Sequence, residues 1–568
     1  MSRDVALPVT VSPPLTRLTQ TILPLCLLLV VLVLLGAATS WSLLVTVPLL
    51  CRVARPHLRR DGVTVGAALI VGGSALSLLA TTNLGMSLTT LGGITGAFAV
   101  TATLAWWWRS SRRLSWGLGA FVVVACCLVL VGTIQVDIDF AKLNSLSIAV
   151  YGWFRRWPHL DNVGFSQNAT AALIVAVLPF AVAFAVRAGS LARRGLAASA
   201  VLWLLFAVVI TLSRGAYFGV SLGLAAMIWL AGGKTRWLAP APPLATVGLL
   251  LLGVTGYEFT LTTTPTGWSS ADRLYIWHAA LRILADFPIT GPGSGAFPLL
   301  FPYYTWPNDG RYMPHAHNFL LQTYLDSGIA GLIGLAVMGL TFVAGIRHLL
   351  GKTLPAELRM LTIAAAGSAV GIFAHGSVDA YFWGDARTFY VVFVPLAVFL
   401  AVWRLSGQGR LFPENLRLPP WRWQWPRGHA VAAGATPGAA ALLGIGAMLV
   451  ALLVGLGVPP LTSLALTNSG NVLRSHGELL PAGAPLQAWF YRAAQWSFQR
   501  AGLIDIKNGI AWQDLADVYL DEGDTTDASL CLELASKEGE QDTLIARDTN
   551  RLDMLAIARA GTGTRVTH

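Results

Sequence analysis

The chain has 568 residues, of which 55% are apolar and only 12% are charged, whereas a soluble domain carries about a quarter charged residues. This composition excludes an ordinary soluble protein and makes lipid the main solvent of the folded chain. The net charge of +11 is not gathered in a Lys/Arg-dense stripe, which excludes a nucleic-acid-binding surface. The five cysteines form neither a zinc-binding spacing nor a disulfide framework.

Thirteen largely uncharged segments are long enough to cross a bilayer, which takes roughly 17 to 25 residues in a helix. The first is interpreted as a retained helix rather than a signal peptide, because no persuasive cleavage site follows it. We therefore expect an all-α fold with about 12 to 13 transmembrane helices. The segments lie near residues 19–36, 37–51, 62–80, 86–106, 114–133, 169–187, 196–212, 215–231, 237–256, 319–345, 359–376, 388–404 and 431–457.

The loop charges give these segments a direction. Arg-rich loops at 52–60, 109–113 and 187–194 are cytoplasmic by the positive-inside rule, and the later basic loops then fall on the same side. The turn at Ser213 and Arg214 faces the other compartment. So do four longer segments, at about 134–168, 257–318, 377–387 and after 458.

Two domains are expected, a transmembrane domain at 1–457 with a long outer loop at about 257–318, and an extracytoplasmic helical tail at 458–568. The tail contains one segment, about 509–542, with tetratricopeptide-like spacing. Because one repeat cannot bury its apolar face alone, it is expected to pack on helical flanks such as 485–500, on the membrane part or on a protein partner. A stabilising cap and a docking module are both compatible with it. The residues that match are Trp512, Leu515, Ala516, Tyr519, Gly523, Ala528, Leu532 and Ala535.

Several arginines break the rule that outer loops are poor in Arg. Guanidinium groups bind phosphate oxygens bidentately, as a lipid diphosphate would require. The alternatives are snorkelling at the interface and pairing with acids, such as Asp272 for Arg273 or Asp379 for Arg387. Arg214 stands out because it interrupts an apolar stretch beside Gly215, where a following helix would add positive charge for an anion. The candidates are Arg214, Arg273, Arg311 and Arg387, with Ser213 as a neighbour.

His315 and His317 lie two residues apart where the outer loop enters a helix that begins near Asn318. No metal is expected, because that loop offers neither an HExxH nor an Asp-x-Asp motif. The remaining alternatives are a histidine that caps the helix and a histidine that takes a proton from an acceptor hydroxyl near neutral pH. His375 and Asp379 are further candidates, because ionisable residues at membrane depth are functional by default, with mutual salt bridging as the alternative.

These motifs occur in the order found in a known family. The turn Ser213-Arg214-Gly215 comes first, followed by 273–277 (RLYIW) and 287–297 (FPITGPGSGAF) in the outer loop. Nine residues then separate His317-Asn318 from Gly328, and two more separate Gly328 from Gly331. Over about residues 160 to 400 the chain resembles the O-antigen ligase and O-antigen polymerase superfamily, which includes bacterial protein O-oligosaccharyltransferases.

The resemblance implies a multi-spanning type C glycosyltransferase that needs no metal, cofactor or nucleotide sugar. Such enzymes take a glycan from a polyprenyl (undecaprenyl) diphosphate carrier at the outer face of the bacterial cytoplasmic membrane, with inversion expected. The acceptor is a hydroxyl of a glycan, lipid or protein. By the same resemblance Arg214 and Arg273 bind the diphosphate, and His317 orients or deprotonates the acceptor. His315 and the tail are absent from typical lipopolysaccharide ligases.

A transporter or flippase of lipid-linked glycan is the alternative, because the same Arg and His residues could line a translocation path. Inverted repeats of short, Gly/Pro-broken helices would favour a transporter, and none is convincing here. A third interpretation has the tail as a docking module and the membrane part as its scaffold. Ligase, polymerase and protein oligosaccharyltransferase share the donor and differ in the acceptor, so the sequence leaves all three open.

Overall fold

A computed structural model describes residues 62–134, 152–154, 156, 167–251, 270–305, 312–380, 389–408, 459–538 and 543–563. These residues form 18 α-helices and one 3-10 helix, and no β-strand occurs among them. The predicted all-α fold is therefore confirmed. The predicted segments at 19–36, 37–51 and 431–457 lie outside the described residues.

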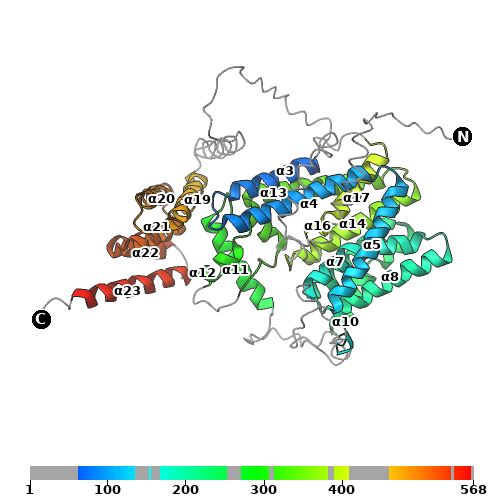
Figure 1. The fold of residues 1–568 in the computed structure, drawn as a ribbon, viewed down its shortest axis with the longest axis horizontal. Coiled ribbons are helices and arrows are strands. Elements are labelled where there is room, and N and C mark those ends of the chain that lie inside the picture. Colours follow the sequence, from blue (N-terminus) through cyan, green and yellow to red (C-terminus); the bar gives the residue numbers. More distant parts are fainter. Residues whose placement is uncertain are drawn as a thin grey trace, which may run out of the picture.

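The membrane part is a bundle that occupies the right side of Figure 1. Seven of its described helices (α4, α5, α7, α8, α9, α13 and α14) are long and apolar enough to cross a membrane, while α3 and α17 are apolar but shorter. The protein is thus a multi-pass membrane protein. The helices are α3 (Gly62–Ser77), α4 (Leu84–Trp107), α5 (Ser111–Ile134), α7 (Gln167–Arg187), α8 (Leu191–Ile210), α9 (Arg214–Ala231), α10 (Ala241–Leu251), α13 (Phe319–Leu350), α14 (Ala356–Gly376), α16 (Phe389–Val392) and α17 (Val394–Leu405), with the 3-10 helix η3 (Gly233–Leu238) after α9.

Helices α9 and α14 pack with their backbones in contact. A Cβ atom added at Gly219 would lie 2.9 Å from the carbonyl oxygen of Gly371, and one at Gly223 would lie 2.7 Å from that of Gly367. Small residues four apart let transmembrane helices approach this closely, because lipid supplies no hydrophobic drive for their association. Because the two helices run antiparallel, the start of α9 lies beside the end of α14.

Helix α13 is kinked at Gly328, whose φ of 59° and ψ of −165° are non-helical. A Cβ atom there would lie 2.2 Å from the carbonyl oxygen of Ile289, so the outer loop sits directly against the kink. The backbone conformation and the close approach both require glycine. The nine-residue spacing from Asn318 to Gly328 therefore has a structural reason.

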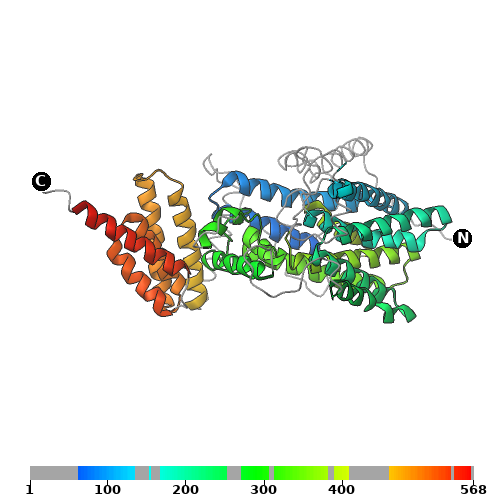
Figure 2. The ribbon, with the colours of Figure 1, turned by 90° about the horizontal axis from the view of Figure 1, so that it is seen from below.

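The loop predicted to lie on the outer face forms a layer between the bundle and the tail (Figures 1 and 2). It contains α11 (Ser270–Asp286) and α12 (Phe297–Tyr304), while 252–269 and 306–311 lie outside the described residues. The two helices share a small apolar core. Its buried members include Ile283, Phe287, Phe297, Phe301 and Met313.

The tail consists of α19 (Pro459–Glu478), α20 (Pro485–Ile504), α21 (Gly509–Glu522), α22 (Thr525–Glu538) and α23 (Thr543–Gly563). The predicted repeat covers α21 and α22, which meet at Gly523 in a left-handed cap. Its apolar face packs on α20 through Leu515, Ala516 and Phe498, so the helical flank covers it as expected. The tetratricopeptide assignment itself stays a prediction.

Candidate active site

Four elements far apart in sequence meet at one end of the bundle. Arg214 opens α9, Arg273 lies on α11, the histidines lie on the loop before α13, and Asp379 follows α14. A Cβ atom at Gly215 would lie 3.0 Å from Cδ2 of His375, which places Arg214 beside the end of α14. The charge of Arg273 interacts with those of Asp379 and Arg214. The structure thus brings together six of the predicted residues: Arg214, Arg273, His315, His317, His375 and Asp379.

The loop before α13 is tightly held. The backbone N–H of His317 donates to Nδ1 of His315 at 3.2 Å, and Nε1 of Trp277 donates to the carbonyl oxygen of His317 at 3.4 Å. His317 has a φ of 48°, and Leu212, two residues before Arg214, has a φ of 52°. They are the two non-glycine residues with positive φ in the described part of the chain, and such conformations gather at functional sites.

His317 faces a carboxylate. Its Nδ1 lies 3.6 Å from Oδ1 of Asp379, and both residues are largely buried. Burial alone would raise the pKa of Asp379, but its contacts with His317, His315 and His375 hold that pKa well below the usual range. Asp379 is therefore ionised, and a carboxylate beside an imidazole orients the ring and stabilises its protonated form.

His315 differs from His317 in its environment. Burial, and then the positive charge of a protonated His317, lower the pKa of His315 to about 3. His315 is therefore neutral at physiological pH, and its Nδ1 accepts the hydrogen bond from the His317 backbone. We interpret His315 as a residue that holds the loop.

The two arginines form a cationic region beside this pair. Burial lowers the pKa of Arg273, the negative charge of Asp379 opposes that shift, and the nearby positive charge of Arg214 adds to it. Two guanidinium groups this close favour an anion between or beside them. Arg214 stands in the first turn of α9, where the helix dipole adds partial positive charge.

Two secondary candidates lie at helix starts. Oδ1 of Asn318 accepts from the backbone N–H groups of Leu320 and Leu321, and its Nδ2 donates to the carbonyl oxygen of Ser377 at 2.9 Å. Asn318 therefore caps α13 and ties it to the end of α14, so neither histidine is the side-chain cap. Ser213 is the buried N-cap residue of α9, and its side chain makes no capping hydrogen bond.

Some expectations lie outside the part of the chain that the structure describes. Arg311, Arg387 and the side chain of Asp272 belong to this group, so the predicted pairs of Arg387 with Asp379 and of Arg273 with Asp272 are not tested.

Sequence reasoning assigned no role to Gln322 and Asp326, which lie beneath the histidine loop. Gln322 Oε1 accepts from the backbone N–H of Ala316 at 2.9 Å, and Gln322 Nε2 donates to Asp326 Oδ2 at 3.0 Å. Both side chains are nearly inaccessible. Two polar residues at positions i and i+4 of an otherwise apolar helix were the available signal.

One group among the described residues could hold a metal ion. Candidate ligand atoms of His315, His317 and Asp379 lie within 4.8 Å of one another. The donor set fits a metal poorly, since Arg273 places a positive charge beside it and Nδ1 of His315 already accepts a hydrogen bond.

Residues 199–336 match the family model of the O-antigen ligase. The chain carries an O-antigen ligase domain. The matched region contains Arg214, Arg273 and His317, and the superfamily expected from the motif order is thereby confirmed. An O-antigen ligase domain implies a glycosyltransferase of the ligase or polymerase type, with a lipid-linked glycan as donor. A comparison with curated proteins found no match.

Proposed function

We propose that this O-antigen ligase domain transfers a glycan from a polyprenyl diphosphate carrier to a hydroxyl acceptor at the outer face of the bacterial cytoplasmic membrane. The observation that carries the proposal is the convergence of Arg214 and Arg273 with the facing pair His317 and Asp379. The reaction needs cationic groups for the leaving group and a base for the acceptor, and these are separate residues here.

The leaving group is the polyprenyl diphosphate. Negative charge develops on its phosphate oxygen as the bond to the anomeric carbon breaks, so preorganised guanidinium groups stabilise the transition state. Arg214 and Arg273 take this role. A site of this kind lowers the barrier without a divalent cation, because the arginines are charged at any physiological pH.

His317 acts on the acceptor. Its Nε2 takes the hydroxyl proton while the acceptor oxygen attacks the anomeric carbon, and the carbon–oxygen bond to the diphosphate breaks in the same step. Attack opposite the leaving group inverts the anomeric configuration. Asp379 faces Nδ1 and stabilises the imidazolium that forms.

The test is transfer by purified protein in lipid nanodiscs, with a polyprenyl-diphosphate glycan and a hydroxyl acceptor. His317→Ala and Arg214→Ala are expected to lose transfer on the order of 100-fold or more. His348→Ala and Arg347→Ala are matched controls, because both lie at the opposite end of α13, and they should retain transfer.

If either site variant keeps full transfer activity, the role proposed for that residue is wrong. Donor binding and movement across the bilayer without any new glycosidic bond would instead identify a transporter. The acceptor class follows from the glycans that accumulate when the protein is removed from cells: intact long chains on the carrier indicate a ligase, and single repeat units a polymerase.

A further inference from the structure

The tail contacts the outer loop through buried polar groups. Oδ1 of Asn468, on α19, accepts from the backbone N–H of Ile289 at 3.0 Å, from that of Thr290 at 3.2 Å and from Oγ1 of Thr290 at 3.2 Å. Asn468 is only 5% exposed. The two backbone donors on this buried acceptor fix the loop backbone at 289–290, since an unsatisfied N–H there would be costly.

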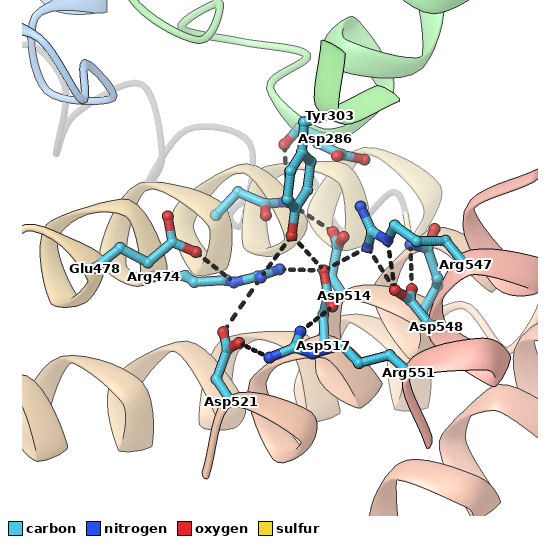
Figure 3. A network of polar contacts seen from close by, with 12 residues as sticks. Asp286, Tyr303, Arg474, Glu478, Asp514, Asp517, Asp521, Arg547, Asp548 and Arg551 are labelled. Atoms are coloured by element: carbon cyan, nitrogen blue, oxygen red, sulfur yellow. Dashed lines mark hydrogen bonds and ion pairs between the residues drawn. The ribbon is translucent and has the colours of Figure 1, made fainter. Parts of the chain in front are cut away.

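A second set of contacts anchors the same surface (Figure 3). Nη2 of Arg474 on α19 donates to the hydroxyl of Tyr303 on α12 at 3.4 Å, and Arg547 on α23 stacks over the ring of Tyr303, with its guanidinium carbon 4.3 Å from the ring centroid. Nδ2 of Asn471 donates to the backbone carbonyl of Asp286 at the end of α11. The tail is thus bound to α11 and α12 through a buried network.

The loop held by Asn468 in turn holds α13. The carbonyl oxygen of Ile289 accepts from the N–H of Ile329, next to the kink at Gly328. Six residues further along the loop, the N–H of Gly295 donates to Oδ1 of Asp326 at 2.7 Å, and Oγ of Ser294 donates to the carbonyl oxygen of Asp326. The loop therefore fixes the carboxylate of Asp326.

Asp326 is linked to the histidine loop through Gln322. Its Oδ2 accepts from Gln322, and Gln322 accepts from the N–H of Ala316, the residue between His315 and His317. Ala316 and Ser294 are fully inaccessible, and Asp326 and Gln322 nearly so. A continuous series of buried hydrogen bonds thus leads from the loop to the backbone that sets His317.

We propose that Asn468 is a positioning residue for transfer, which acts through the 289–295 loop, Asp326 and Gln322 on the backbone at Ala316. The proposal rests on the proposed function of His317. The tail is then an integral part of the transferase, because α19 must contact the 289–290 loop for His317 to be placed correctly. Docking of a partner or acceptor is not required to explain why the tail lies where it does.

The experiment compares three full-length variants in the nanodisc transfer assay. Asn468→Ala removes the acceptor oxygen, and kcat should fall on the order of 10- to 100-fold, because a small displacement of a catalytic group costs that much. The KM for the donor should stay within about twofold, since neither Arg214 nor Arg273 is a member of this hydrogen-bonded series. Asn468→Asp keeps an oxygen that can accept from the backbone N–H groups of Ile289 and Thr290, and its kcat should stay close to that of the parent.

Asn508→Ala is the matched control. Asn508 caps α21 by accepting from Ala511, and its Nδ2 donates to Ser463 at 2.8 Å and Thr467 at 3.0 Å, so its loss weakens the tail without touching the loop. Its kcat should stay close to that of the parent.

Three results would overturn the proposal: unchanged kcat in Asn468→Ala, an equal loss in Asn508→Ala, or a loss confined to the KM for the acceptor. The last would assign acceptor binding to the tail. If His317→Ala and Arg214→Ala abolish transfer while Asn468→Ala does not, only the positioning role fails. If those two variants retain transfer, the proposed function fails first.

Discussion

Nδ1 of His317 lies 3.6 Å from Oδ1 of Asp379, across a distance of more than sixty positions in sequence. We expect Asp379→Asn to lower kcat for transfer by roughly 10² to 10⁴-fold, the range seen when the carboxylate partner of a catalytic histidine is neutralised. The carboxylate stabilises the imidazolium that forms during transfer, and a neutral amide cannot do so. The measurement is kcat for both proteins in the nanodisc transfer assay. Full activity in Asp379→Asn would show that Asp379 does not assist His317.

A chelator distinguishes the two uses of the cluster formed by His315, His317 and Asp379. If the cluster is a base with its orienting carboxylate, protein treated with excess EDTA and then dialysed retains full transfer. Elemental analysis should then give far less than one metal ion per chain. Activity that disappears with EDTA and returns with Zn²⁺ or Mg²⁺ would instead make these residues metal ligands.

Much of the site could be predicted because its residues violate membrane rules. An Arg in an apolar stretch and an ionisable group near a helix end are conspicuous against lipid, so Arg214 and Asp379 were found without structure. The loop charges also predicted that these residues share one face, and the structure groups them at one end of the bundle. Which of them touch could not be predicted, since Asp379 meets His317 only because Asn318 ties the start of α13 to the end of α14.

The role of the tail was hidden for a different reason. Asn468 accepts hydrogen bonds from backbone N–H groups of the loop, and backbone partners leave no pattern in a sequence. The spacing of the tail predicted helices that need a covering surface, and α20 supplies one. The residue spacing of the tail did not indicate that α19 also binds the loop at Ile289 and Thr290.

Gly223 tests the packing that places Arg214 beside α14. Gly223→Ala would bring a methyl group to 2.7 Å from the carbonyl oxygen of Gly367, which is backbone and cannot rotate away. We expect a loss of about 1 to 3 kcal/mol in the free energy of unfolding, as for other overpacked sites. Gly72→Ala, in α3, is the control, since a Cβ atom there meets nothing within 4 Å. Thermal unfolding in detergent should separate the two, and equal midpoints would show that α9 and α14 are not in backbone contact.

Asp286 gives the interface between loop and tail a pH dependence. Its carboxylate accepts from Tyr304 and lies near Asp514 (Figure 3). Burial raises the pKa of Asp286 to about 7, although the hydrogen bond from Tyr304 opposes the shift. Burial and then the charge of Asp286 likewise raise the pKa of Asp514 well above its usual range.

The sign of the effect follows from proton binding. Between the ordinary pKa of about 4 and a pKa of about 7 in the folded protein, the folded state holds a proton that the unfolded state has released. Stability therefore falls as pH rises through this window and levels off above it. Asp286→Asn cannot ionise, and its amide oxygen can still accept from Tyr304.

We therefore expect Asp286→Asn to resist thermal unfolding and proteolysis of the tail better than the parent at pH 8, and to differ little from it at pH 4. Glu533→Gln is the control, because Glu533 is exposed and pairs only with Lys537 one turn away among the described residues. It should leave the pH dependence unchanged. A variant whose advantage over the parent is the same at both pH values would show that Asp286 is already ionised in the folded interface.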